Sequence, residues 1–456
     1  MSLSSLLSIA RSALLTHQSA MAVTSHNVAN ANTPGFSRQR LDMSAATPLL
    51  TPFGAVGRGV TNDGAQRIRD AFLDQAFRRE SGSFERSQTM RDMLGRVESV
   101  LGEPGDSGLA AMLDQFFGAL GDLANDPANP TPRNLVRQAA GQVIRRFSVQ
   151  NAQLQDLERE TGDRMQADVG EVNRLAREIA DLNARIVVSA SGPGATAPDL
   201  QDARDQLVDR LSSIMAVRVL PRTDGSIGVV AGDTLLVDET GFQELSVRAA
   251  TGGGFGVGLT SGSGLISLSD GRLKALSDLT TTEIPGVRAQ LDQLAGALVA
   301  EVNTIHRTGF TLGGATGTDF FDPSGVTAGT LSLTVAIQSS VDAIAAGGTA
   351  AAGDGDVALQ LAGLRNTGLT ALGGATVGDF YAGVVTGVAG KVQGATQDAA
   401  VGDTVVTNID SRRAAVSGVS IEEEMVNLIS QQQAFSAASR LVNVADEMMQ
   451  DILRMV

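Results

Sequence analysis

The sequence predicts a mainly helical α+β protein with three parts: paired, coiled-coil-like helices from the two ends of the chain, a bundle of long helices, and a small inserted antiparallel β domain. Three observations predict it. Both ends of the 456-residue chain carry apolar residues at a seven-residue spacing, which is typical of a coiled-coil seam. Helical patterns fill most of the middle, whereas residues 217–268 contain short β-branched runs separated by glycines.

The first helix is expected from Ser4 to Asn27, and the last helix begins after Ser420, which with Glu423 forms a capping box. A narrow apolar stripe is hardly stable alone in water, because helix nucleation is costly. We therefore expect the two ends to pack on each other or on other subunits, which favours an assembly protein. The seam residues predicted to form the assembly interface are Leu7, Leu14, Met21, Val28, Ile421, Leu428, Phe435, Val442 and Met449.

The first helix is expected to stop in the segment Asn30 to Phe36. Asn tolerates the left-handed conformation at a helix end, and Pro34-Gly35 occupies the central positions of a type II turn. Residues 37–67 are rich in Gly, Pro and Thr and are expected to form an extended or irregular linker, with room for a short hairpin.

The bundle is predicted from residues 65–214, in which Met165, Val172, Ile179 and Ile186 keep a seven-residue spacing. Helix returns at 283–305. A glycine-rich stretch, 309–378, is expected to contain a strand at 331–335 and a helix at 357–364, and residues 379–409 form another helix.

The inserted β domain is predicted from five short runs, at 217–220, 227–230, 235–237, 245–247 and 265–268, with an Asp-Gly hairpin signal at 224–225. We therefore expect three units: 1–36 plus 418–456 as a terminal assembly domain, 37–216 plus 273–417 as the helical bundle with its linkers, and 217–272 as an outer β-rich domain.

Composition disfavours most catalytic and binding functions. A net charge of -15 opposes nucleic-acid binding, and no apolar run reaches the length of about 18 residues expected of a membrane-spanning helix. With three histidines and no cysteine, we expect no catalytic residues, no cofactor and no metal site. The first residues lack the features of a cleaved secretory signal, which suits a cytoplasmic protein or one exported unfolded without cleavage.

Two segments resemble those of bacterial flagellar proteins. Residues 28–39 (VANANTPGFSRQ) resemble the N-terminal signature of the axial proteins of rod, hook and hook-associated structures. Residues 418–429 (GVSIEEEMVNLI), followed by 431–441, are similar to the C-terminal signature of the flagellar hook-associated protein 1 family, and 224–237 and 353–364 are similar to internal segments of that family. The axial signature residues are Asn30, Asn32, Thr33, Pro34, Gly35 and Phe36.

This resemblance implies a structural adaptor that joins the flagellar hook to the filament and polymerises through its terminal helices after type III export. Its implied partners are the hook protein, the next hook-associated protein toward the filament, further copies in a ring or tube, and an export chaperone at the C-terminal helix. The implied location is the extracellular hook–filament junction, reached without a cleaved signal peptide. The chain is short for the family, so an outer domain of longer members is expected to be reduced or missing.

Two other functions stay open. Another axial protein, of the hook or the distal rod, would share the first signature but lack the ending at 421–425. An axial scaffold carrying a wall hydrolase is the remote alternative, because such an enzyme needs paired carboxylates or a metal site. The acidic residues that the β region offers for this are Asp224, Asp233, Asp238, Glu239 and Glu244.

Overall fold

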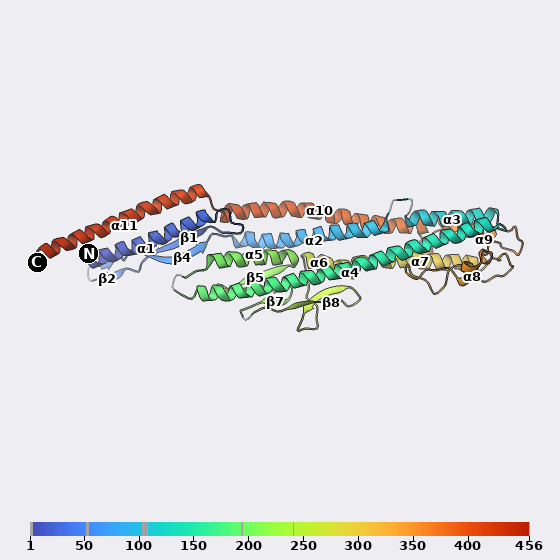
Figure 1. The fold of residues 1–456 in the computed structure, drawn as a ribbon, viewed down its shortest axis with the longest axis horizontal. Helices are drawn as coiled ribbons and strands as arrows, with labels where there is room; N and C mark the ends of the chain where they lie inside the picture. Colours follow the sequence, from blue (N-terminus) through green and yellow to red (C-terminus); the bar gives the residue numbers. More distant parts are fainter. Residues whose placement is uncertain are drawn as a thin grey trace.

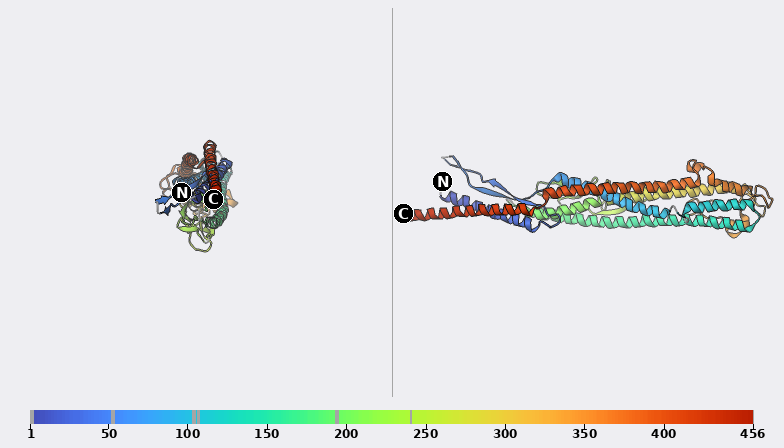
Figure 2. Two further views of the ribbon diagram at one scale, coloured as in Figure 1. Left: turned by 90° about the vertical axis from the view of Figure 1, so that its left-hand side faces the viewer. Right: turned by 90° about the horizontal axis from the view of Figure 1, so that it is seen from above.

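The computed structural model describes residues 3–51, 54–102, 105, 108–192, 195–239 and 241–455. They form a narrow rod, as Figure 1 and the end-on view of Figure 2 show. Helices α1 (Leu3–Ala29) and α11 (Ile421–Met455) occupy one end of the rod, and both termini lie there. The remaining long helices form its body.

Helices α1 and α11 run antiparallel, and we call them the terminal pair. Asn27 near the end of α1 bonds Glu424 near the start of α11, and His17 Nδ1 lies 2.7 Å from Gln431 Oε1, about two turns further along α11. Of the two packing partners expected for the ends, the structure therefore has the intramolecular one. Helix α11 begins as expected, since the Glu423 amide donates to Ser420 Oγ at 3.4 Å.

The linker after α1 is more regular than predicted. Strand β1 (Gln39–Ala45) pairs antiparallel with β4 (Val60–Arg67), with a register shift between Leu41 and Met43. Between them, β2 (Leu49–Thr51) pairs with β3 (Gly54–Val56) as a second, shorter ribbon. Strands β1 and β4 pack along α1, which buries Leu41. These strands were not predicted because turn-forming residues interrupt the short stretches in which apolar and polar side chains alternate.

The body contains α2 (Ala71–Leu101), α3 (Leu109–Asn125), α4 (Pro130–Ser189), α5 (Pro198–Ile214), α6 (Arg272–Asp278), α7 (Ile284–His306) and α10 (Val377–Ser417). Helices α2 and α10 pack antiparallel, and α4 runs almost the length of the body (Figure 1). The predicted seven-residue repeat of α4 is confirmed as a core face, because Met165, Val172, Ile179 and Ile186 are all fully buried. A π-helical turn, Leu279–Glu283, joins α6 to α7.

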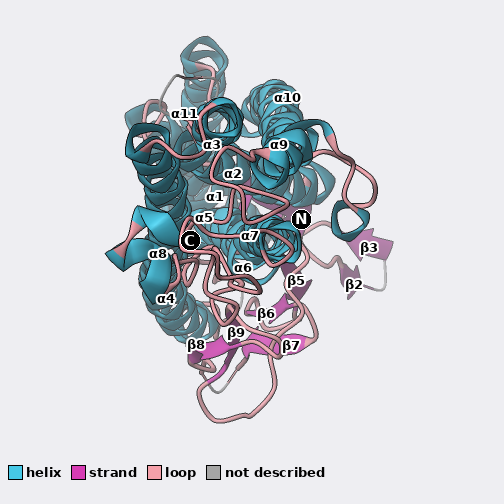
Figure 3. Cartoon of the chain, turned by 90° about the vertical axis from the view of Figure 1, so that its right-hand side faces the viewer, coloured by secondary structure: helices cyan, strands magenta, loops and turns pink. Residues whose placement is uncertain are grey.

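The β region lies on one flank of α4 (Figure 3). Strands β5 (Val217–Pro221), β6 (Ile227–Ala231) and β7 (Thr234–Val237) form one antiparallel sheet, and β8 (Leu245–Ala249) pairs with β9 (Phe255–Leu259). Four of the five predicted runs are strands. The fifth, 265–268, is wrong, because it forms only an isolated bridge from Leu265 to Gly258. The strand that pairs with β8 is β9, which was not predicted because glycines alternate with its apolar residues.

The end of the rod remote from the termini holds residues 309–376, with α8 (Val335–Ser339) and α9 (Asp356–Gly363). The strand predicted at 331–335 is wrong, since only Leu333 forms a bridge, to Phe321, before α8 begins. Four rings cluster here, and those of Phe320 and Phe321 lie 4.9 Å apart beside Phe116 and Phe117. Burial of these aromatic side chains therefore stabilises the end of the rod that has little regular secondary structure.

Candidate assembly interface

The turn after α1 has the predicted geometry. The Phe36 amide donates to the carbonyl of Thr33 at 3.2 Å, and Gly35 has φ of 75°, as the third position of a type II turn requires. A Cβ at Gly35 would collide with the side chain of Gln206, so no larger residue fits without displacing that contact. Thr33 Oγ1 donates to Asn30 Oδ1 at 3.1 Å, and this side-chain bond links the start of the turn to the end of α1.

The same turn attaches to α5. Gln206 Nε2 donates to the Pro34 carbonyl at 3.1 Å, and His26 Nε2 lies 3.2 Å from Asp199 Oδ1. The rings of His26 and Phe36 meet edge to face at 5.4 Å. The axial signature residues Asn30, Thr33, Pro34, Gly35 and Phe36 therefore build the corner between the terminal pair and the body, while Asn32 is exposed.

Helix α5 carries four carboxylates, Asp199, Asp202, Asp205 and Asp209, on one face; we call them the aspartate stripe. Like charges three or four residues apart destabilise a helix unless cations face them. Here each one has a partner from another segment. Ser37 donates to Asp202 through both its amide and its hydroxyl at 2.8 Å, and Arg67 Nη1 bridges Asp202 and Asp205 at 2.8 and 2.7 Å.

Asp205 is a buried member of the stripe, with 8% of its surface exposed. Burial alone would raise the pKa of its carboxyl, but the guanidiniums of Arg67, Arg69 and Arg78 outweigh burial and hold that pKa below the usual range. Arg69 also pairs with Asp74 at the start of α2 at 2.8 Å. A buried charge that loses its partner is strongly destabilising. Any other orientation of these segments would separate the pairs, so the network favours the one orientation in which all of them form.

Two arginines extend the network to the last two helices. Arg413, near the end of α10, bonds Asp74 at 2.9 Å and Asp209 at 2.8 Å, and its guanidinium lies over a ring of α2. Arg38 bonds Glu424 of α11 at 2.7 Å, and its amide donates to the Ser417 carbonyl at the end of α10 at 2.8 Å. We call this meeting point of α1, α2, α5, α10 and α11 the joint.

Glu424 is the buried anchor of α11, with 3% of its surface exposed. Its carboxylate accepts bonds from Asn27 Nδ2 at 2.9 Å and Arg38 Nε at 2.8 Å. Asn27 in turn exchanges two bonds with the backbone of Gln39, at 2.8 and 2.9 Å. One asparagine therefore ties together α1, β1 and α11.

The predicted assembly residues divide into two groups. Leu428, Phe435 and Val442 are half-buried on the side of α11 that includes the buried Glu424, Ala438 and Ala445, and the four α1 residues are also half-buried. Ile421 and Met449 are 48% and 39% exposed. The most buried apolar residues of α1 are instead Ala10 and Ala20, whose small side chains allow neighbouring segments to approach closely.

Helix α11 has many further apolar side chains without cover in the subunit. We call them the outer face of α11; its members are Met425, Val426, Ile429, Leu441, Val444, Met448, Ile452 and Leu453, all at least 42% exposed. Helix α11 also extends past the start of α1 (Figure 1). Exposed apolar surface of this extent marks an interaction site.

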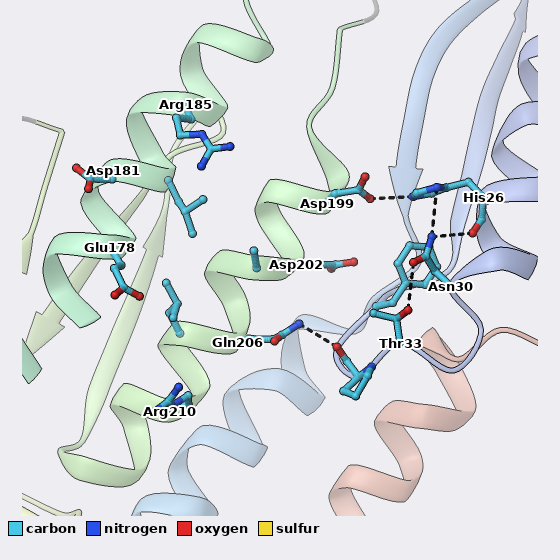
Figure 4. Close-up of a pocket in the computed structure, with 15 residues that line it drawn as sticks. His26, Asn30, Thr33, Glu178, Asp181, Arg185, Asp199, Asp202, Gln206 and Arg210 are labelled. Carbon is cyan, nitrogen blue, oxygen red and sulfur yellow. Dashed lines mark hydrogen bonds and ion pairs between the residues drawn. The ribbon is translucent and has the colours of Figure 1, made fainter. Parts of the chain in front are cut away.

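A groove of about 710 Å³ opens beside the joint (Figure 4). One side is the turn with Pro34 and Phe36, and the other sides are the end of α4 and the start of α5. Leu182, Ala203 and Leu207 supply apolar lining. Its charged lining consists of Glu178, Asp181, Asp199, Asp202, Arg185 and Arg210.

In the described part of the chain, no three His, Cys, Asp or Glu side chains are grouped in a way that would hold a metal ion. None of the described helices combines the length and the apolar character needed to cross a membrane.

Sequence reasoning located the turn but not the joint. Arg67 and Arg413 lie far apart in sequence and belong to no quoted motif, and nothing in the signature segment 28–39 indicates which carboxylate Arg38 pairs with. The aspartate stripe is the feature of the sequence that could have predicted the joint. Four carboxylates on one helical face predict that cationic side chains from other segments lie opposite them.

Comparison with known proteins identifies similar chains. Residues 94–321 match the model of the flagellar hook-associated protein FlgK helical domain. Residues 7–36 match the flagella basal body rod protein model, and 413–455 match the C-terminal model of the flagellar basal body rod FlgEFG proteins.

Flagellar hook-associated protein 1 of Bacillus subtilis (strain 168) is 30% identical, with 98% of this chain and 97% of that protein aligned. The protein of the same name from Escherichia coli (strain K12) is 29% identical, with 70% of this chain and 60% of the relative aligned. The flagellar hook junction protein FlgK from Burkholderia pseudomallei has a similar fold, with a TM-score of 0.66, 14% identity, and coverage of 75% of this chain and all of that one.

Proposed function

The chain belongs to the flagellar hook-associated protein 1 family, and we propose that it is a structural adaptor that joins the flagellar hook to the filament and polymerises through its terminal helices. The observation that carries the polymerisation is the outer face of α11. This face runs along a helix already paired with α1, so a further partner must come from outside the subunit.

The predicted assembly residues fit this scheme in two roles. Leu428, Phe435 and Val442 support the terminal pair within one subunit, whereas Ile421 and Met449, near the two ends of α11, are exposed and available to a neighbouring copy. Burial of a large apolar side chain contributes about 1.5–3 kcal/mol. Eight such residues on the outer face are therefore sufficient for stable packing of α11 on neighbouring copies in a ring or tube.

The proposed partners are the hook protein on one side and the next hook-associated protein on the other. Before export by the flagellar type III route, a chaperone binds α11, because an amphipathic helix with an uncovered apolar face suits a helix-binding groove. The protein acts in the flagellum as a structural component without enzymatic activity. We retain the division into a terminal domain, a helical body and an outer β-rich domain as part of this proposal.

Purified chain added to filament-less hooks tests the adaptor role, with electron microscopy to detect binding at the hook tip and later filament growth. The double variant Ile429→Asp/Leu441→Asp changes the outer face alone, so its monomer should melt like the wild type but fail to bind hooks. The matched control is Gln433→Asp, an exposed polar position on the same helix. Hook binding by the double variant at the wild-type level would refute polymerisation through this face.

The second candidate, another axial protein of hook or rod, is favoured by the matches of both terminal segments to rod-protein models. A strain that lacks this chain distinguishes the two. An adaptor predicts complete hooks with detached filaments, whereas a rod or hook component predicts that hooks themselves are missing.

A further inference from the structure

The short ribbon of β2 and β3 exposes apolar side chains on both of its faces. Leu49 is 57% exposed and Leu50 is 85% exposed. Neighbouring residues in a strand point to opposite faces, so these two leucines show that neither face is covered. An isolated two-stranded ribbon is at best marginally stable in water. The ribbon therefore needs a surface on which to pack.

The ribbon cannot reach the groove beside its own joint. At its base, Gly59 lies against Ile9 and Ser12 in the first half of α1, while the lining of the groove starts at His26 in the last turn of that helix. About 15 residues of helix at 1.5 Å each separate the two, or roughly 22 Å. Strand β1 leads away from the joint along α1. An occupant from this segment must come from another copy.

The two surfaces are complementary in chemistry. Residues 43–62 contain one charged side chain, Arg58, in a chain with a net charge of -15. The charged lining of the groove consists of four carboxylates and two guanidiniums, so it is acidic overall, and its apolar lining includes Leu182 and Leu207. Its volume of about 710 Å³ falls within the range of about 300–1,000 Å³ that is typical of binding sites.

We propose that the β2–β3 ribbon of one copy inserts Leu49 and Leu50 into the groove beside the joint of a second copy. This inference rests on the proposed polymerisation. The contact joins two different surfaces of the same chain, so it is heterologous and repeats from copy to copy, as a ring or a tube of copies requires. Because the groove wall includes the turn at Pro34, the contact also couples the corner of one subunit to its neighbour.

Thiol cross-linking tests the contact directly, because the chain contains no cysteine. One chain carries Leu50→Cys and a differently tagged chain carries Ala203→Cys, at an exposed residue that lines the groove. The two are mixed, bound to filament-less hooks and treated with a short bismaleimide. A dimer that contains both tags is expected. Pairing Leu50→Cys with Val335→Cys, exposed at the far end of the rod, provides the control.

The outcomes separate this contact from the adaptor role. Hook binding without the mixed dimer, or a dimer no stronger than the control, overturns ribbon docking and leaves the adaptor role intact. A Leu50→Cys adduct with hook protein instead assigns the ribbon another partner and also overturns the proposal. Failure of wild-type chain to bind hooks would count against the adaptor role and, with it, against the contact.

A second variant checks the apolar contribution. Leu49→Asp/Leu50→Asp changes two side chains that are exposed in the monomer, so the melting temperature should not move. Incorporation at hooks should require at least about tenfold more protein, because two leucines lose their burial. Thr47→Asp places a charge near the same ribbon without removing a leucine. Equal incorporation of the double variant and wild type would contradict the proposal.

Discussion

Replacing Glu424 by Gln should release α11 from the joint while leaving the body of the rod intact. The carboxylate is 3% exposed and accepts bonds from Asn27 and from two nitrogens of Arg38 at 2.7–2.9 Å. Loss of a buried ion pair typically costs about 3–5 kcal/mol. Arg38 is 23% exposed and keeps Glu423, so we expect about 2–3 kcal/mol here.

Hydrogen exchange of the α11 amides in the monomer measures this change, since it reports local opening. A loss of 2 kcal/mol corresponds to roughly 30-fold faster exchange. The melting temperature of the body should stay within about a degree or two of wild type, because the Glu424 carboxylate bonds Asn27 of α1 and Arg38 of the linker rather than a body helix. Thr24, buried beside Glu424, should lose protection together with α11.

The matched control is Glu423→Gln. Glu423 bonds the same arginine at 2.9 Å but is 64% exposed, so its loss should cost less than about 1 kcal/mol. Equal acceleration of exchange in the two variants would refute the view that burial of Glu424 anchors the helix. A parallel fall in the melting of the whole rod would show that the terminal pair does not open separately.

Three further predictions concern the joint, the terminal pair and the far end. Asp205→Asn should lower the free energy of unfolding by about 3–5 kcal/mol in urea titrations, while Asp181→Asn, on the exposed groove rim, should change it by less than about 0.5. Leu428→Asp should abolish filament attachment in motility assays, whereas Glu422→Gln weakens only a helix-start interaction of about 0.3–1 kcal/mol and should remain motile. Burial lowers the pKa of His306, so stability present above about pH 6.5 should fall as the pH drops toward the folded pKa, and His306→Gln should lack that step in urea midpoints measured from pH 8 to 5.

Interactions among residues that are close together in the sequence determined several features of this structure. The seven-residue period of α4 specifies which side of that helix is buried, because side-chain direction repeats with the helical turn. The corner at Pro34-Gly35 follows from the backbone angles that those two residues allow. The Ser420 cap likewise depends only on residues within one turn. Each of these features was predicted from neighbouring residues alone.

Tertiary structure decided which segments meet. The sequence contains the aspartate stripe, but only the fold brings Arg67 and Arg413 to it, because an ion pair depends on where distant backbones lie. It also decided that residues 255–259, rather than the predicted run at 265–268, form the strand that pairs with β8. A seven-residue repeat shows that a helix has an apolar stripe but cannot specify the partner, because any apolar surface of suitable shape satisfies it. The sequence therefore left open whether α1 packs on α11 or on another subunit, and the fold decided for α11 and showed the exposure that this leaves on the outer face.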